Sequence, residues 1–303
     1  MLVCLPAGHE NAKAWQHMEE EMPRWASVAQ EQDELMRAPL IAALVVSGAI
    51  TPALSAPQLA PHRAVYDLSL IDASERSGIS GVSGRMVYEF NGSACDGYTV
   101  SFRSVTQFQT AENARLIDQQ VATYENPEQD LFTFVTKSYV DEQLDKEVKG
   151  TAHAVSDGVK VDLEKPDEGT VRLTPALFPA EHMIDLLERA RNGEHFYETT
   201  IFDGTEGADK VLTTTVIIGA RKESSAGDEE TTAAAALSDK PYWAVSIAYF
   251  DDPQPDTDAT PIYRIGFKLH DSGIARDFDT DYGDFRIKGR LVDLELLAMP
   301  ECR

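Results

Sequence analysis

An alternation of apolar and polar residues at a period of two runs through most of the chain after residue 60, and it limits the possible folds more than any other feature. The alternating runs are rich in β-branched and aromatic residues, which favour strands. Gly-containing turn sequences such as Asp96-Gly97 and Asp157-Gly158 separate neighbouring runs and are typical of hairpins. The pattern predicts strands at 62–71, 84–90, 98–108, 116–124, 131–140, 151–155, 159–163, 195–202, 210–220, 242–250, 262–270, 274–278 and 285–297.

One segment, residues 179–191, changes to a helical period. Pro179 stands at its start and Arg191 at its end, as is typical of helix termini. Its apolar residues fall on one face: Met183, Leu186, Leu187 and Ala190. So many consecutive strands must hide their edges by curling. We therefore predict an all-β dominated fold, a many-stranded antiparallel β-spiral or open barrel with one inserted α-helix.

Residues 36–55 have the pattern of a signal peptide. Arg37 supplies the positive charge, residues 39–50 carry no charge, and the small residues Ala53 and Ser55 precede a cleavage site. The apolar run is shorter than the ~20 residues that a membrane-spanning helix needs. The sequence predicts export followed by cleavage.

Residues 1–35 contain seven acidic residues, which is unusual ahead of a signal peptide. We interpret them as an N-terminal extension from an upstream start codon, with Met36 as the true start. The alternative is a cytoplasmic amphipathic helix ahead of a membrane anchor. The rest, 56–303, is predicted as a single β-spiral domain. Residues 222–240 lack an apolar pattern and are rich in Ser, Gly, Glu, Thr and Ala, which predicts a disordered loop.

Two cysteines, Cys95 and Cys302, lie beyond the predicted signal peptide, and Cys4 lies before it. An even pair in an oxidising compartment predicts a disulfide between Cys95 and Cys302. The alternatives are two separate buried thiols or a metal pair, although two sulfurs without a clustered His do not complete a tetrahedral zinc site. The bridge would tie the C-terminus to the body of the domain.

The formal net charge of −24 disfavours nucleic acid and anionic lipid headgroups as partners, because both attract Lys and Arg. The histidines are scattered, and neither a P-loop nor a dinucleotide fingerprint is present. Acidic residues cluster at 251–258 and 277–284, but an acidic turn explains them better than a calcium loop, which would end in Glu. We predict no catalytic residue, no metal site and no cofactor, and leave calcium binding by these two loops open.

Aromatic residues at alternate positions form the one candidate for a ligand-binding face. Such residues line a cavity inside a curved sheet or, more often, fill the core. The ligand itself is unknown from the sequence. The residues in question are Tyr66, Tyr88, Phe90, Tyr98, Phe102 and Phe108.

Three tracts resemble the cell-envelope integrity EipB family. They are APHRAVYDLSL at 60–70, GRMVYEFNGSACDGYTV at 84–100 and DYGDFRIKGRLVDLELL at 281–297, ahead of Cys302. The resemblance covers nearly all of residues 60–303. It implies a monomeric periplasmic β-spiral with a long helix and one disulfide, at the positions of Cys95 and Cys302. The chain departs from the family pattern in its 35-residue leader and in the 222–240 insertion.

The resemblance also implies a function. Members of the EipB family are tied to envelope integrity under stress and to a periplasmic tetratricopeptide-repeat partner. Their shape is similar to that of lipoprotein-carrying half-barrels. We therefore expect a non-enzymatic periplasmic protein that maintains the cell envelope by binding a periplasmic protein. A carrier of lipid or lipoprotein acyl chains is the alternative, and a hydrolase using paired carboxylates such as Asp279 and Asp281 is a third hypothesis.

Overall fold

The computed structural model describes residues 58–205, 207–225, 228, 230, 232–251, 259–300 and 302. The predicted extension at 1–35 and signal peptide at 36–55 lie outside the described residues.

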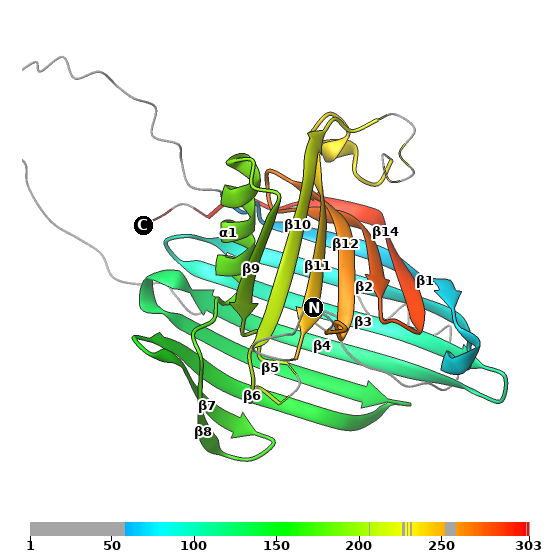
Figure 1. The fold of residues 1–303 in the computed structure, drawn as a ribbon, viewed down its shortest axis with the longest axis horizontal. Helices are drawn as coiled ribbons and strands as arrows, with labels where there is room; N and C mark the ends of the chain where they lie inside the picture. The colour runs from blue at the N-terminus through cyan, green and yellow to red at the C-terminus, as the bar shows by residue number, and fades with distance from the viewer. Residues whose placement is uncertain are drawn as a thin grey trace, which may run out of the picture. The chain divides into compact units, whose positions relative to one another are not determined.

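The described strands form one antiparallel sheet (Figure 1). Its spatial order is β8-β7-β6-β5-β4-β3-β2-β1-β14-β13-β12-β11-β10-β9, and it is accompanied by one α-helix and three short 3-10 helices. The predicted fold class, a many-stranded antiparallel open barrel with one inserted helix, is confirmed. The elements are β1 (His62–Ala73), β2 (Ile79–Ser93), β3 (Gly97–Thr110), β4 (Ala114–Asn126), β5 (Leu131–Val140), β6 (Gln143–Val155), β7 (Gly158–Lys165), β8 (Gly169–Leu173), α1 (Pro179–Arg191), β9 (Phe196–Ile201), β10 (Leu212–Lys222), β11 (Tyr242–Phe250), β12 (Tyr263–His270), β13 (Ala275–Asp281) and β14 (Phe285–Leu296), with 3-10 helices at Glu75–Ser77, Pro127–Gln129 and Ala235–Leu237.

Three stretches of strand were not predicted. Strand β8 is short and mostly exposed, so it shows no alternation. Strand β6 begins at Gln143 and not at the predicted residue 151; its first four residues are exposed, and alternation starts only around the buried Val148. Residues 79–83 precede the predicted strand 84–90, but they belong to β2 and pair with the end of β3. Backbone pairing with a regular neighbour therefore extends strands into sequences that have no strand pattern of their own.

The sheet consists of two meanders that meet at one seam. Strands β1 to β8 pair in chain order, as do β9 to β14, and β1 pairs with β14 where the two meanders join. Strands β8 and β9 form the two edges and do not pair with each other. In Figure 1, β9 to β12 cross in front of β2 to β6, and α1 stands beside β9.

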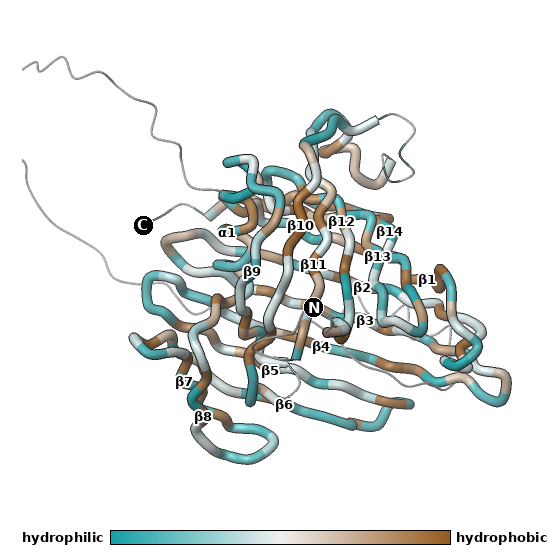
Figure 2. Tube along the Cα trace, in the orientation of Figure 1, coloured by the Kyte–Doolittle hydropathy of each residue, from teal (hydrophilic) through white to brown (hydrophobic). Residues whose placement is uncertain are grey.

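Helix α1 and the strands around it share one apolar core. Leu186, Leu187 and Ala190 of α1 are buried against β9 to β12, together with Phe90 and Tyr98 from the other meander. Figure 2 shows the hydrophobic and hydrophilic residues alternating along the strands. The helix thus fills space that the curved sheet encloses, and burial of its apolar face is what positions it.

Four phenylalanines join the two meanders near the open edges. Phe132 of β5 contacts Phe134, Phe178 and Phe202, and Phe202 also contacts Phe134 and Phe178; ring centroids lie 5.2–6.4 Å apart. Phe178 precedes α1, and Phe202 follows β9. The backbone after Phe202 can run directly against the Phe134 ring because residue 204 is glycine. Gly204 has φ +70°, and a Cβ there would lie 2.5 Å from Cγ of Phe134.

The described part of the 222–240 segment is packed, which corrects the prediction of a disordered loop. We call the described residues between 223 and 240, namely 223–225, 228, 230 and 232–240, the strap. Its 3-10 helix buries Leu237 in a core cluster with Tyr66 and Leu291, and Glu230 is 3 % exposed. The strap is attached mainly through Asp228, Glu230 and Leu237, whose partners lie in strands distant in the sequence. The composition of the segment does not reveal these contacts and therefore predicted disorder.

Candidate functional site

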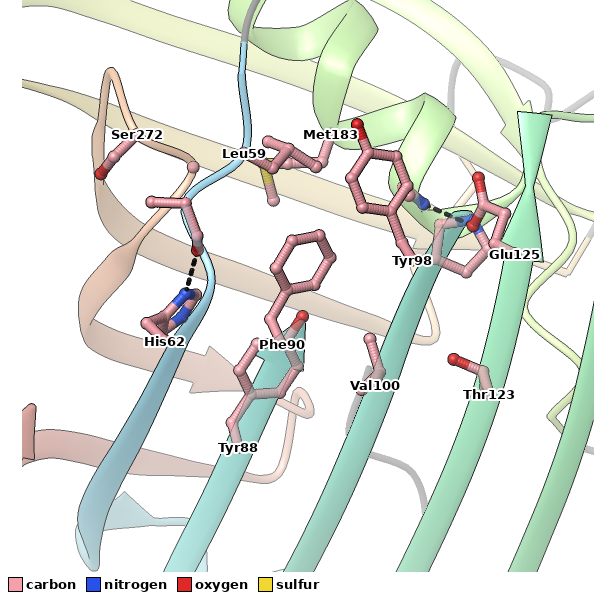
Figure 3. Close-up of a pocket in the computed structure, with 14 residues that line it drawn as sticks. Leu59, His62, Tyr88, Phe90, Tyr98, Val100, Thr123, Glu125, Met183 and Ser272 are labelled. Atoms are coloured by element: carbon pink, nitrogen blue, oxygen red, sulfur yellow. Dashed lines mark hydrogen bonds between the residues drawn. The ribbon is translucent and has the colours of Figure 1, made fainter. Parts of the chain in front are cut away.

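An apolar pocket lies between the N-terminal end of α1 and the inner face of β1 to β4 (Figure 3). Its volume is about 70 Å³. Its walls combine three of the aromatic residues singled out in the sequence, Tyr88, Phe90 and Tyr98, with Met183 of α1. The other three, Tyr66, Phe102 and Phe108, pack in a separate core cluster. The predicted aromatic face is therefore divided between a pocket and the core.

The polar side chains in this wall include a carboxyl group, that of Glu125, and an imidazole, that of His62. The Glu125 carboxylate accepts hydrogen bonds from the backbone N–H groups of Ala180 (2.7 Å) and Glu181 (2.9 Å), as Figure 3 shows in part. The residue before the helix is Phe178, whose side chain cannot accept a hydrogen bond, so a carboxylate from β4 caps the first turn of α1 instead. His62 Nδ1 donates to the Ala60 carbonyl at 2.8 Å.

Burial changes the ionisation of both groups. It raises the pKa of Glu125 to about 7, although the two backbone hydrogen bonds act in the opposite direction. It lowers the pKa of His62, and it raises the pKa values of Tyr88 and Tyr98, to which Glu125 adds a smaller contribution. The pocket therefore holds one carboxyl group that titrates near neutral pH.

We predict that Glu125 makes the protein less stable as pH rises from about 4.5 to about 7. Its folded-state pKa lies above the ordinary value of 4.5, so the folded protein binds the proton more tightly in this interval. The resulting stabilisation, up to about 3 kcal/mol, is complete below pH 4.5 and lost above pH 7. Glu125→Gln removes this dependence. Urea unfolding of both proteins at a series of pH values measures it.

The informative quantity is the difference in the free energy of unfolding between the variant and the wild type, because the contributions of His62, His182 and other titrating groups cancel in it. That difference should move in favour of the variant by up to about 3 kcal/mol between pH 4.5 and pH 8. The exposed Glu128→Gln variant should follow the wild-type profile. Parallel profiles for wild type and Glu125→Gln would contradict the prediction.

The two cysteines predicted to pair lie at bonding distance in the structure. Cys95, in the turn between β2 and β3, is joined to Cys302, and their Cα atoms are 5.6 Å apart. Strand β1 lies between β2 and β14 in the sheet. The bond therefore connects the segment after β14 to the β2–β3 turn, across β1.

The acidic residues of the 277–284 cluster are paired with basic residues. Asp277 lies 2.9 Å from Lys268 and also contacts Lys288. Asp279 and Asp281, the carboxylates of the hydrolase hypothesis, contact Arg286 (2.6 Å) and Arg264 (3.8 Å). Most of the 251–258 cluster lies outside the described residues. Within the described part of the chain, no group of three or more His, Cys, Asp or Glu could hold a metal ion.

An exposed apolar pair stands at the β9 edge of the sheet. Phe196 of β9 and Ile217 of β10 are directly paired across the strands, and they are 57 % and 55 % exposed. Cross-strand partners on one face of a sheet are in contact distance. Large apolar side chains grouped on a surface mark interaction sites.

The sequence analysis did not single out Glu125, Phe196 or Ile217. A signal was present for Glu125, because it shares the inward register of β4 with Val121 and Thr123 and is thus an acid on an apolar face. For Phe196 and Ile217 no signal was available, since an outward-facing apolar residue in a strand has the same pattern as a buried one.

Of the segments described, no helix has the length and apolar character needed to span a bilayer. The fold defines a class: a barrel-like open antiparallel sheet that encloses one helix. Residues 53–298 match the EipB-like family model. The chain belongs to the EipB-like family.

Two similar proteins come from Brucella abortus. The cell envelope integrity protein EipB of strain 2308 is 49 % identical over 245 residues, which cover 80 % of this chain and 86 % of that protein. The crystal structure of a β-barrel-like protein of the domain of unknown function DUF1849 has a TM-score of 0.77 at 48 % identity, covering 80 % of this chain and 100 % of that one.

Proposed function

We propose that this chain is a non-enzymatic periplasmic protein that maintains cell-envelope integrity by binding another periplasmic protein. Membership of the EipB-like family and the name of its Brucella relative support the envelope role. The bonded pair Cys95 and Cys302 supports an oxidising compartment. The family resemblance suggests a tetratricopeptide-repeat protein as the partner.

The observation that carries partner binding is the exposed pair Phe196 and Ile217. Phe196 on the edge strand β9 and Ile217 on its neighbour β10 lie side by side, and both side chains are more than half exposed. Apolar anchors of this kind dominate the energy of protein interfaces. The apolar pocket under α1 gives lipid carriage less support, because its volume of about 70 Å³ is well below the ~300–1,000 Å³ typical of small-molecule sites.

We expect the double variant Phe196→Ser, Ile217→Ser to lose partner capture by about tenfold or more, since interface anchors are worth roughly 2 kcal/mol or more when truncated. Both side chains are exposed, so folding should be retained. The measurement is crosslinking in intact cells, purification of the adduct, identification by mass spectrometry, and a dissociation constant with the identified protein.

The matched control is Leu144→Ser. Leu144 is 52 % exposed and lies at the start of β6, on the other meander. This variant should bind the partner as the wild type does. Equal binding by the Phe196→Ser, Ile217→Ser variant and the control would place the interface elsewhere and remove this proposal.

A further inference from the structure

The β9 edge of the sheet carries backbone hydrogen-bonding groups that have no partner. Strand β9 pairs with β10 through alternate residues, and in this ladder the Ile218 N–H donates to the His195 carbonyl at 2.9 Å. The N–H and C=O groups of Phe196 and Glu198 therefore point away from β10. Within the described part of the chain, no backbone or side-chain group bonds to them.

The other half of the same edge already receives an added segment. The Leu177 N–H donates to the Thr200 carbonyl at 3.0 Å, and the Phe202 N–H donates to the Leu177 carbonyl at 2.9 Å, which forms a short parallel bridge. Pro175, two residues earlier, has no N–H with which to continue this bridge toward the Glu198 carbonyl. The edge thus has the geometry for a further strand, and the chain itself uses only the C-terminal end of β9.

Helix α1 lies against the inner face of β9 and leaves the outer face open. The Arg189 guanidinium carbon is 4.3 Å from the ring centroid of Tyr197, which is buried in the core around α1. Phe196 and Glu198, the neighbours of Tyr197 along the strand, face the other way and are exposed. Strand β8, the opposite edge, is described in full and has no exposed large apolar side chain. The β9 edge therefore combines open backbone groups with an apolar surface, that of Phe196 and Ile217.

The charges at this edge favour a basic segment. Glu198 has no ion-pair partner among the residues that the structure describes. The nearest arginine of α1, Arg189, is already shared by Asp185 at 2.9 Å and Glu194 at 3.0 Å, so it does not neutralise Glu198. Opposite charges on directly paired strand residues are stabilising, and like charges are destabilising. The net charge of −24 opposes a second copy of this chain at the same edge.

We propose that an extended, basic segment of the bound protein adds to the open half of the β9 edge as a further strand. Its backbone pairs with Phe196 and Glu198, an apolar side chain packs on Phe196 and Ile217, and a Lys or Arg lies opposite Glu198. The inference rests on the proposed function and specifies the chemistry of the partner. Glu198 then selects against acidic strands, because a charge on an edge strand limits unwanted pairing.

The test uses a peptide whose backbone and charge can be changed separately. In fluorescein-Gly-Val-Thr-Lys-Thr-Val-amide, a Lys opposite Glu198 places a Val beside Phe196 in either strand direction. One derivative is N-methylated at the Lys and both Val, and the other at both Thr. Only one of these alternate sets of N–H groups can face β9. Fluorescence anisotropy with the full chain measures binding.

We expect a saturable rise in anisotropy with the parent peptide, and binding at least tenfold weaker for one methylated derivative than for the other. Glu198→Lys should weaken binding of the parent peptide about tenfold, because a repulsion replaces an attraction. A peptide with Glu in place of Lys should restore binding to this variant. Glu112→Lys is the matched control, since Glu112 is exposed in the turn between β3 and β4, and it should bind the parent peptide as the wild type does.

Equal binding of the two methylated derivatives, or failure of the charge exchange at residue 198, would overturn the added strand. A dimer in sedimentation velocity that excludes the peptide would also overturn it, because a second copy would then take the edge. If the added strand fails while partner capture still depends on Phe196 and Ile217, the proposed function stands without it. If the peptides bind as expected but capture ignores Phe196 and Ile217, the proposed function fails and the chemistry of the edge remains.

Discussion

Truncation of Glu230 in the strap to alanine should lower the free energy of unfolding by about 3–5 kcal/mol, the cost of leaving a buried charge without its partner. That charge is Arg276 of β13, whose side chain is 2 % exposed and lies 3.1 Å from Glu230 Oε2. The other oxygen of Glu230 accepts the backbone N–H groups of Leu291 (2.6 Å) and Asp277 (3.1 Å). Removal of the carboxylate therefore leaves three buried donors with fewer acceptors.

The surrounding charges explain why Arg276 stays ionised. Burial acts against its charge, but hydrogen bonds to Asp228 and Glu230 outweigh it and raise the pKa of the guanidinium. Burial would likewise raise the pKa of Asp228, yet hydrogen bonds from Lys268 and Arg276 hold it at about 2. His270 accepts from Arg276 Nε at 3.0 Å, and burial with the adjacent positive charge lowers its pKa to about 4, so it remains neutral.

Guanidinium unfolding of the full chain measures the loss, and hydrogen exchange should show the strap opening in Glu230→Ala. Asp239→Ala is the matched control, because Asp239 belongs to the same strap but its side chain is 74 % exposed beside Lys240. The control should unfold at the wild-type midpoint. A loss below about 1 kcal/mol in Glu230→Ala would mean that the strap contributes little to the fold, contrary to this prediction.

Loss of the Cys95–Cys302 bond should have an effect of similar size. The sequence separation is 207, and the chain-entropy model assigns about 5 kcal/mol to a loop of that length. The double variant Cys95→Ser, Cys302→Ser should thus unfold at lower denaturant concentration, as should the reduced wild-type protein. Because the bond holds the segment after β14, that segment should also become susceptible to proteolysis.

Intact mass after alkylation, with and without reductant, shows whether the two thiols are bonded in protein taken from cells. The Cys95→Ser, Cys302→Ser variant treated with reductant is the control, because it has no bond to lose and its denaturation midpoint should not change. If reductant leaves the denaturation midpoint of the wild type unchanged while both thiols become alkylated, the predicted stabilisation is wrong.

Strands with a buried face were predictable from the sequence, and those without one were not. The predicted bounds of β5, β11 and α1 agree with the structure, because in each the apolar residues repeat at the period of the element. Strand β8 has no such repeat and exists through pairing with β7. Local periodicity records burial, whereas pairing depends on a neighbour that lies elsewhere in the chain.

The candidate sites were harder to predict for the same reason. Glu125 and Glu230 look like ordinary surface acids in the sequence, and only the elements they meet, the first turn of α1 and Arg276 of β13, give them a role. Sites of this kind arise from the topology, which the alternating pattern does not specify.

The seam between β1 and β14 also determines the order in which the fold can form. Each meander needs contacts that are mainly local along the chain, but the pairing at the centre of the sheet joins its first strand to its last. Contacts between residues far apart in the sequence are slow to form, because the chain loses the entropy of closing a long loop before the contacts can compensate for that loss. The middle of this sheet is therefore completed last, after its flanks. A ribosome-bound or partly translocated chain that still lacks β14 therefore cannot pair its two meanders within the sheet.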